Sequence, residues 1–243
     1  MRVEIWSDVV CPWCYIGKRK FEAALASYQG DETFEIVWRP FQLDPTAPKG
    51  TAQPVRQVYE KKFGGPERAA EIIEHVTSVA AGVGLDFEMD RAVRANTMDA
   101  HRLIGHALTL NGPAMQSAVK ERLMQAYFTE GRNIGDVVTL ADLAAEVGMD
   151  PDEVSAFLAS DEGTIDLMAE IEEALDIGVT GVPHFVFDGR WAIPGAQDPE
   201  LFLRAFQRMA HLKASEAAEA SETEAAMPQG DAETCRVDAR PES

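Results

Sequence analysis

The sequence has few cysteines and no long apolar run, and each shortage excludes a class of protein. Its 243 residues include three cysteines, Cys11, Cys14 and Cys235. Small secreted proteins held together by disulfides carry many more in a shorter chain, so a structural disulfide framework is excluded. No window approaches the roughly 18 to 20 consecutive apolar residues of a membrane-spanning helix. The first residues also lack the basic and apolar regions of a secretory signal, so we expect a cytoplasmic protein.

Cationic side chains are also scarce. Lys and Arg number 22 against 41 Asp and Glu, which gives a net charge of −19. Repulsion from phosphates makes nucleic acids and anionic membrane surfaces unsuitable partners. Apolar residues make up 46% of the chain, enough for a core that needs no disulfides.

The first forty residues follow a strand–helix–strand pattern. Val3 and Ile5 alternate with Glu4 and Trp6, which predicts a strand that runs into the stretch SDVVCPWCYIG. Apolar residues then recur at helical spacing up to Gly30, which we expect to end that helix. A second strand is predicted in FEIVWRPF. This order is typical of a parallel unit with the cysteines at its first strand-to-helix junction.

The middle of the chain, residues 53–177, has a helical period throughout. Thr139 with Asp142 resembles a capping box, and Asp150 before Pro151 predicts another helix start. Four apolar residues form the last helical stripe: Ile165, Met168, Ile171 and Leu175.

The C-terminal part returns to strands before a last helix. Asp188-Gly189 lies between two short apolar runs and predicts a tight hairpin. Asp198 and Pro199 then open a helix. The acidic tail, residues 213–243, has no aromatic residue and almost no large apolar one, so we predict that it is disordered.

Cys11 and Cys14 are the strongest candidates for a functional site. After a strand, Cys11 falls at or next to the N-cap of a helix, with Pro12 in the first turn. Free backbone N–H groups and the helix dipole favour a thiolate there, so we expect the pKa of the Cys11 thiol to be lowered. Cys14 lies on the same face one turn later, close enough for a disulfide. We predict Cys11 as a solvent-facing nucleophile and Cys14 as a shielded resolving thiol.

Two other interpretations of the cysteine pair are weaker. A structural zinc site usually needs four ligands, and the third cysteine, Cys235, lies in the expected tail. His101 and His106 are five residues apart, which places them on different helix faces. We therefore expect no metal and no cofactor other than a redox-active Cys11–Cys14 disulfide. Two inert thiols are the remaining alternative, but a strand–Cys-Pro-x-Cys–helix junction is a rare coincidence for them.

A second motif, GVTGVPHFVF, contains Val182 and Pro183. An X-Pro bond in a folded protein is cis in only about 5% of cases, so the local sequence leaves both isomers open. A proline that simply starts a strand is the alternative.

Five segments together resemble the DsbA-like thioredoxin-fold oxidoreductases, specifically their FrnE-type branch. They are SDVVCPWCYIGKRKFE, VWRPFQLDP, NTMDAHRL, AYFTEGRNIG and GVTGVPHFVFDGRWAIPGAQ. They occur in order and cover the chain up to the tail. The resemblance implies an α/β, thioredoxin-like fold with an all-helical domain inserted between the second and third strands. The thioredoxin-like domain would comprise residues 1–52 and 178–212, and the insertion residues 53–177.

The resemblance also implies a site and an activity. Val182–Pro183 would be cis and packed against Cys11, and the Val182 backbone would pair with a substrate chain. The implied reaction is dithiol–disulfide exchange, with disulfide isomerisation as a variant. Its partners would be protein or peptide thiols and disulfides, with glutathione as a candidate co-substrate.

Two features depart from the family pattern. Several FrnE-type members have a second cysteine pair in the tail, whereas Cys235 stands alone here, so we expect no relay between two disulfides. Pro12 and Trp13 place no cationic side chain between the cysteines, so we expect a less oxidising pair, with Lys18, Arg19 and Lys20 as partial compensation.

A sister branch provides the alternative function. The kappa-class glutathione transferases and 2-hydroxychromene-2-carboxylate isomerases resemble this chain in architecture, and they usually carry a serine at the first cysteine position. Cys11 argues against that glutathione-dependent isomerase or transferase activity.

Further polar and aromatic residues have two interpretations each. Asp8 is a candidate proton acceptor for Cys14, although an acidic residue that caps the strand-to-helix turn is the commoner explanation. His184 either approaches the dithiol or is turned away by strand alternation. We expect Trp13 to shape the rim of the site and His101 to be structural.

Overall fold

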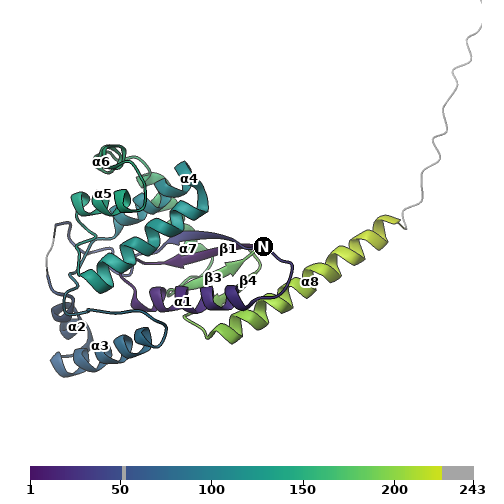
Figure 1. Cartoon of the computed structure of the whole chain (residues 1–243), viewed down its shortest axis with the longest axis horizontal. Coiled ribbons are helices and arrows are strands. Elements are labelled where there is room, and N and C mark those ends of the chain that lie inside the picture. Colours follow the sequence, from purple (N-terminus) through teal and green to yellow (C-terminus); the bar gives the residue numbers. More distant parts are fainter. Residues whose placement is uncertain (51–52, 226–243) are drawn as a thin grey trace, which may run out of the picture. The chain divides into compact units, whose positions relative to one another are not determined.

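The computed structural model describes residues 1–50 and 53–225 (Figure 1). By their contacts, Met1–Leu203 form one compact unit, and the described residues from Arg204 to Ala225 belong to another. The candidate site lies in the first unit. No helix in the described part of the chain combines the length and hydropathy that crossing a membrane requires.

A four-stranded sheet forms the centre of the first unit. Its strands are β1 (Arg2–Ser7), β2 (Glu35–Pro40), β3 (His184–Phe187) and β4 (Trp191–Pro194), in the spatial order β2-β1-β3-β4. β1 pairs parallel with β2, with Ile5 opposite Trp38, and antiparallel with β3, with Ile5 opposite Phe185. β3 and β4 form the predicted hairpin, in which Asp188 and Gly189 both adopt positive φ.

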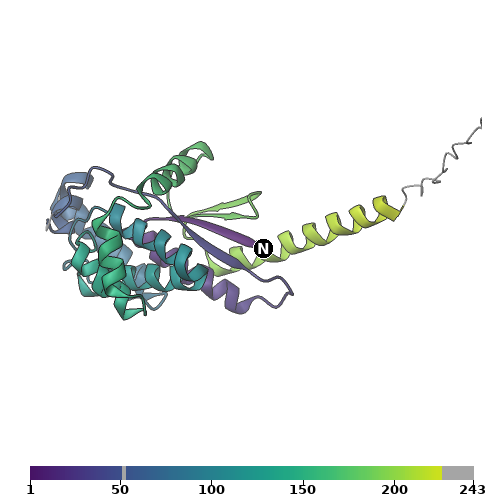
Figure 2. The ribbon, with the colours of Figure 1, turned by 90° about the horizontal axis from the view of Figure 1, so that it is seen from above.

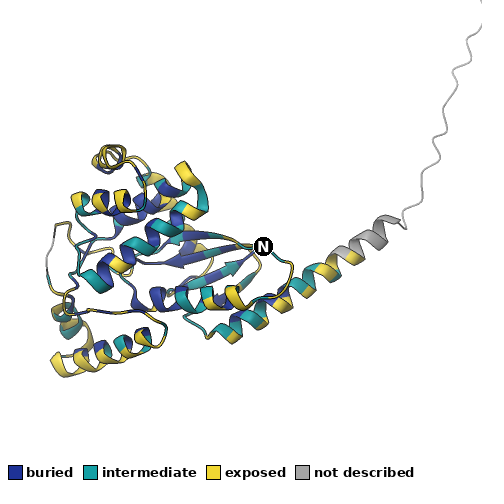
Figure 3. Ribbon diagram, in the orientation of Figure 1, coloured by how far each residue is buried: buried dark blue, intermediate teal, exposed yellow. Residues whose placement is uncertain are grey.

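Helices cover both faces of the sheet. On one face, Phe21 of α1 (Pro12–Ser27) packs against Phe185, with ring centroids 5.2 Å apart, and against Phe202 at 5.5 Å. On the other face, Trp6 packs with Ala174 of α7 (Thr164–Asp176). Figure 2 shows the strands between these helices, and Figure 3 shows the buried residues concentrated in the strands and on the helix sides that face them. The layers follow from strand alternation, because Ile5 and Trp6 point to opposite faces.

The other helices of the first unit lie between β2 and β3 in the sequence. They are α2 (Val55–Phe63), α3 (Pro66–Ala81), α4 (Met98–Gln125), the π-helix η1 (Ala126–Glu130), α5 (Val137–Glu146) and α6 (Pro151–Ala159), followed by α7. The predicted α/β fold with a helical insertion between the second and third strands is therefore confirmed. That residues 53–177 form a domain of their own stays a prediction, since the contacts place them in one unit with the sheet.

The edge strand β2 is covered by α4. The buried amide of Gln116 accepts a hydrogen bond from the Trp38 backbone N–H at 2.9 Å and donates one to the Trp38 carbonyl at 2.9 Å. Ser117 Oγ accepts a further bond from the Trp38 indole at 2.9 Å. Gln116 thus satisfies the two backbone groups that a neighbouring strand would otherwise satisfy.

A kink divides α4 into two halves. Gly112 has φ 77° and ψ −173°, which is not helical, and Pro113 follows it. Glycine adopts positive φ without the steric cost that a side chain brings, and proline suits the first turn of the second half. His101 lies before the kink, and Gln116 and Lys120 lie after it.

The structure corrects several expectations about individual elements. Helix α1 ends at Ser27 rather than Gly30, because the Tyr28 backbone turns to an extended conformation there. The N-cap of α5 is Asp136, whose carboxylate accepts from the Thr139 N–H at 2.9 Å, instead of the expected capping box at Thr139. Asp150 caps α6 as predicted.

The stripe on α7 is largely solvent-exposed. Ile165 is 83% exposed, and Met168 and Leu175 are also exposed, whereas Leu167 and Ala174 are buried. The side of α7 that is buried therefore has fewer apolar residues than the exposed side. The helical period of the sequence alone does not show which side is buried.

The prediction that the whole acidic tail is disordered is wrong for the first part of the tail. The last helix, α8 (Pro199–Ala225), begins at the predicted proline and continues to Ala225. The reason is that alanine and glutamate, which fill this segment, have high helix propensity and extend an existing helix without a new nucleus. The rest of the tail, with Cys235, lies outside the described residues.

Candidate active site

Cys11 begins helix α1, as predicted. It is the N-cap residue, with φ −87° and ψ 114°, and Pro12 follows in the first helical turn. The Cys11 N–H donates to the Asp8 carbonyl at 3.2 Å, and the Cys11 carbonyl accepts from the Cys14 N–H at 3.0 Å. Both cysteines are free thiols, and the helix geometry places them one turn apart on one face.

The Val182–Pro183 loop lies against the first cysteine. The peptide bond between these residues is cis, as the resemblance implies. The Cys11 thiol donates a hydrogen bond to the Val182 carbonyl, with Sγ 3.7 Å from the oxygen. The structure thus brings together residues 171 positions apart.

Gly17 makes room for this loop on α1. A β-carbon added at Gly17 would lie 2.9 Å from Pro183 Cγ, closer than packed carbon atoms come, and 3.3 Å from Ala196 Cβ, which is a tight contact. The glycine at the end of CPWCYIG is therefore a packing requirement of the cis-proline loop.

Both thiols are buried, which corrects the expectation of a solvent-facing Cys11. Cys11 is 3% exposed and Cys14 is 1% exposed. The expected lowering of the Cys11 pKa is also wrong. The hydrogen bond with Cys14, burial and the charge of Asp8 raise the pKa of the Cys11 thiol well above its ordinary value. The helix N-terminus is present, but it does not outweigh the loss of solvation and the neighbouring sulfur.

Aromatic side chains surround the dithiol. Trp13, between the cysteines, is 38% exposed and its ring lies 6.0 Å from the ring of His75 on α3. Burial and the nearby Cys11 raise the pKa of Tyr59 on α2 to about 12. Trp13 is thus partly exposed between the cysteines, and α2 and α3 contribute residues near them; that Trp13 shapes the rim of the site stays a prediction.

Asp8 does not cap α1. Its side chain is fully buried: Oδ1 lies 3.2 Å from His101 Nε2, and Oδ2 accepts a hydrogen bond from the Leu43 N–H at 2.8 Å. Burial lowers the pKa of His101 despite this contact, so the imidazole is neutral near pH 7. The carboxylate therefore ties the β1–α1 turn to the helical insertion, and the commoner explanation, a helix cap, is wrong.

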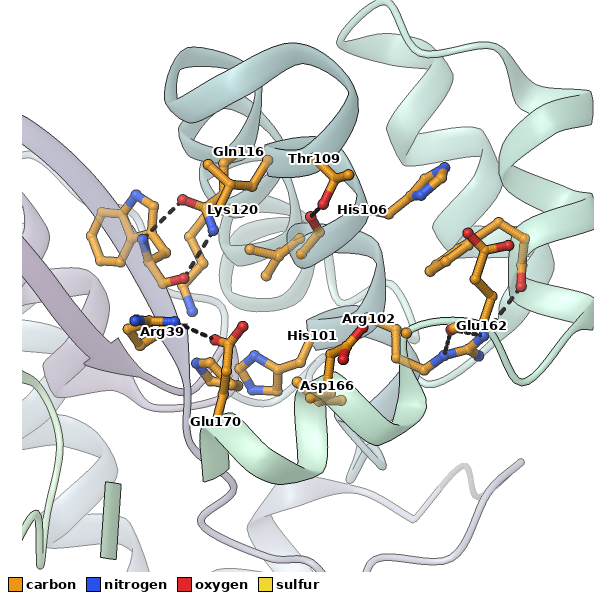
Figure 4. A pocket seen from close by; sticks show the side chains of 18 residues that line it. Arg39, His101, Arg102, His106, Thr109, Gln116, Lys120, Glu162, Asp166 and Glu170 are labelled. Carbon is orange, nitrogen blue, oxygen red and sulfur yellow. Dashed lines mark hydrogen bonds and ion pairs between the residues drawn. The ribbon is translucent and has the colours of Figure 1, made fainter. Parts of the chain in front are cut away.

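A buried lysine, Lys120, lies beneath the same turn. It is 1% exposed, and its Nζ donates to the Ser7 carbonyl at 3.2 Å. Burial lowers the pKa of Lys120 to about 8, against the opposing influence of Cys14, Asp8 and Cys11, in that order. It also lines a cavity of about 210 Å³ between β2, α4 and α7 (Figure 4).

His184 is turned away from the dithiol. It pairs with Trp6 in the sheet register and shares a strand face with Val186, which packs on the Trp6 side. The alternating residue, Phe185, faces α1 instead. Burial lowers the pKa of His184.

Sequence reasoning missed Lys120 and Gln116, although a signal was present. Both lie on one helical stripe with Leu123 and Tyr127, at spacings of four, three and four residues, so two polar residues continue an apolar stripe. A cation on such a stripe is buried only with a partner, and the partner here comes from β1.

Chemically, the arrangement can perform two-thiol redox reactions. No group of three or more potential metal ligands occurs within residues 1–50 and 53–225. A thiol beside a backbone carbonyl, with a second thiol one turn away, is a geometry that allows reversible disulfide formation.

Comparisons with known proteins agree with this arrangement. The model of the DSBA-like thioredoxin domain matches residues 2–207. The structure of a probable DsbA oxidoreductase, SCO1869 of Streptomyces coelicolor, is similar with a TM-score of 0.80 and 36% identity, over 86% of this chain and 89% of that one. The Bacillus subtilis (strain 168) protein YwbO, described as uncharacterized, is 28% identical over 84% of this chain and 95% of its own.

A more distant structure shares the fold. The cytosolic disulfide reductase DsbM of Pseudomonas aeruginosa has a TM-score of 0.61 and 19% identity, over 87% of this chain and 100% of that one. Because the family model spans most of the sequence, the chain belongs to the DSBA-like thioredoxin domain family.

Proposed function

We propose that the protein is a dithiol–disulfide oxidoreductase in which Cys11 attacks and Cys14 resolves. The observation that carries this proposal is the contact between Cys11 and the cis-proline loop, with Sγ 3.7 Å from the Val182 carbonyl. Inert thiols would not require a loop from 171 residues away to close over the N-cap of α1. Membership of the family supports the same reaction class.

The reaction runs through a mixed disulfide. The Cys11 thiolate attacks one sulfur of the substrate disulfide, and the second substrate sulfur leaves as a thiolate that takes up a proton. The Cys14 thiolate then attacks Cys11 Sγ and releases the first substrate sulfur. Two electrons pass to the substrate, and Cys11 and Cys14 end as a disulfide. The reverse sequence oxidises a substrate dithiol.

The partner is a protein or peptide thiol or disulfide, and glutathione is the proposed small co-substrate. A hollow beside the cis-proline loop is lined by residues with small side chains or none: Thr180, Gly181, Val182, Pro183, Gly195 and neighbours. A chain laid there would find the Val182 backbone, the edge-strand mode of peptide recognition. DsbM has a structure with GSH, which supports a glutathione peptide as a ligand of this fold.

Three neighbours of the cysteines have assigned roles in this proposal. Pro12 starts α1 without an unpaired N–H and is buried. Trp13 offers an apolar surface to the substrate. Asp8 is the proposed proton acceptor during the resolving step, because its carboxylate is buried beside the turn that carries Cys11.

Insulin reduction tests the assignment. We expect Cys11→Ser to abolish turnover and Cys14→Ser to trap the mixed disulfide, which non-reducing electrophoresis detects. Cys235→Ser is the matched control and should keep wild-type activity. Turnover that survives in Cys11→Ser would sink the proposal. Isomerase or transferase turnover with glutathione in Cys14→Ser would instead favour the sister activity.

A further inference from the structure

The outer side of helix α7 is apolar although it faces solvent. Ile165 is 83% exposed, Leu175 64% and Met168 57%, and Ile171 is half-buried beside them. Spacings of three, three and four residues put these four side chains, which we call the α7 stripe, on one face of the helix. In Figure 2, α7 stands on the sheet, and no other described helix lies over its outer side. Single exposed apolar residues are ordinary, but a contiguous row is typical of an interaction surface.

The other sides of α7 hold the helix on the sheet without the help of this stripe. Ala174 packs with Trp6 of β1, and Glu170 pairs with Arg39 of β2 at 3.2 Å. Leu167 is buried as well. The packing of the fold therefore does not account for the α7 stripe, since a surface helix normally has polar residues on its outer side.

The charges around the α7 stripe are all negative. No Lys or Arg occurs in residues 133–189. The ion pairs of α7 within the described chain are made by Glu170 and Glu173. Three further carboxylates on this helix are exposed, and they lie within the stripe or along its flank: Asp166, Glu172 and Asp176. A partner that covers the stripe must therefore supply cations at its edges.

This charge argues against two other occupants of the stripe. A second copy of the chain would place the same acids against one another, and each copy has a net charge of −19. An anionic membrane surface would be repelled in the same way. A polypeptide segment that combines a row of apolar residues with Lys or Arg beside them complements both the stripe and its acids.

The C-terminal end of the α7 stripe adjoins the proposed substrate site. Ile177, just after the helix, is 50% exposed, and Gly178 lines the hollow beside the cis-proline loop. With a rise of 1.5 Å per residue, the stripe from Ile165 to Leu175 is about 15 Å long. A substrate chain that lies in the hollow therefore passes the end of the stripe.

We propose that the α7 stripe is a docking surface for protein substrates, and that it selects chains in which a basic, amphipathic segment flanks the reactive cysteine. This inference rests on the proposed function and adds a substrate class to it. The segment packs a helical row of apolar side chains against the stripe, and its Lys or Arg residues meet the exposed carboxylates. Docking leaves the sulfur chemistry unchanged and raises the effective concentration of the substrate disulfide at Cys11.

Three peptides test the docking surface. Each has a segment of about three helical turns, a Gly-Ser spacer and a cysteine held in a mixed disulfide with 5-thio-2-nitrobenzoate. The basic peptide has leucines in a helical row and lysines elsewhere. The acidic peptide has glutamates in place of the lysines, and the serine peptide has serines in place of the leucines. Each is made with the cysteine at either end.

The coloured thiolate reports the reaction with reduced protein. The Cys11 thiolate attacks the peptide sulfur, and 5-thio-2-nitrobenzoate leaves with the bonding electron pair. Cys14 then attacks Cys11 Sγ and releases the peptide thiolate, which takes up a proton. Stopped-flow absorbance gives a second-order rate constant for each peptide. The rate with 5,5′-dithiobis(2-nitrobenzoate), which has no segment to dock, is the reference for each protein.

Relative to this reference, the basic peptide should react at least about tenfold faster than the other two at low salt, because the burial of one large apolar side chain is worth that factor. Its advantage over the acidic peptide should shrink at high salt, which screens exposed charges. The double variant Met168→Ser and Leu175→Ser should lose most of the advantage over the serine peptide. Val138→Ser, which removes an apolar side chain of α5 that is 68% exposed, is the matched control and should keep it.

Binding without thiol chemistry separates this inference from the proposed function. A fluorescent basic peptide that lacks cysteine should bind wild type, and its affinity, measured by fluorescence anisotropy, should fall at least about tenfold in the double variant. Equal affinities for wild type and the double variant, or equal rates for the basic and acidic peptides, would overturn the inference. Peptide binding without any release of coloured thiolate would instead contradict the proposed function.

Two further results would assign the stripe to another occupant and also overturn the inference. Dimers of wild type in sedimentation equilibrium, absent from the double variant, would identify a second copy of the chain. Co-sedimentation of wild type with phosphatidylcholine vesicles, lost in the double variant, would identify a lipid surface.

Discussion

The burial of Lys120 leads to a prediction about how the stability of the protein depends on pH. The pKa of Lys120 is lowered to about 8 in the folded protein from 10.5, so between these values the unfolded chain binds more protons than the folded one. Stability from this residue therefore rises with pH through that window. The two pKa values differ by about 2.5, which lowers the free energy of unfolding by about 3 kcal/mol at neutral pH and below.

The expected magnitude can be worked out for a practical interval. Between pH 7 and pH 9.5, the same two pKa values give a gain of about 2 kcal/mol in the free energy of unfolding of wild type. Lys120→Met lacks this gain, because methionine does not titrate. At pH 7 the variant gains about 3 kcal/mol from the absent buried charge and loses about 1.5 to 3 kcal/mol with the bond to the Ser7 carbonyl, so it should be as stable as wild type or up to about 1.5 kcal/mol more stable.

Urea unfolding of the reduced protein, followed by tryptophan fluorescence at several pH values, measures this difference. Subtracting the variant from wild type cancels the titration of groups that do not interact with Lys120. Lys18→Met is the control, because it removes another buried lysine, one that pairs with Glu22 and Glu121, and keeps Lys120; this variant should keep the rise in stability with pH. If the free energies of unfolding of Lys120→Met and wild type changed in parallel from pH 7 to 9.5, Lys120 would not be a buried ammonium that destabilises the folded protein.

Three further predictions concern the site and its support. Gly17→Ala should displace Pro183 and lower insulin-reduction activity at least about tenfold, whereas wild-type activity would contradict the close packing there. Gln116→Leu leaves the two Trp38 backbone groups without partners and should cost about 2 to 5 kcal/mol in urea unfolding; a loss below about 1 kcal/mol would mean that water replaces the amide. The rate at which iodoacetamide alkylates Cys11, followed by mass spectrometry, should still rise above pH 9, because the pKa of this thiol is raised; a plateau near pH 7 would show the opposite shift.

The sequence predicts those parts of the molecule whose signals are local. The β1–α1 junction, the proline in the first turn of α1 and the Asp188-Gly189 hairpin all rest on residues close together in the chain, and the structure has each of them. The position of the cis-proline loop against Cys11 came from family resemblance, since a local motif cannot state what lies opposite it.

Features that depend on tertiary contacts could not be predicted in this way. The burial of Cys11 depends on a loop 171 residues away, and it reverses the expected direction of the pKa shift. Asp8 has the sequence context of a helix cap, yet its carboxylate binds His101 and the Leu43 backbone. The exposed stripe of α7 shows the same limit, because a helical period does not tell which face meets the sheet.

The topology of the sheet has a consequence for the order of folding during synthesis. β1 pairs with β3, so that Glu4 lies opposite Val186, and the intervening chain must emerge from the ribosome first. At about 5 to 20 residues per second, that takes on the order of ten to forty seconds. Throughout this interval Cys11 lacks the Val182 carbonyl and is open to chance oxidation. The thiol proposed as the nucleophile is thus uncovered until the last strands arrive.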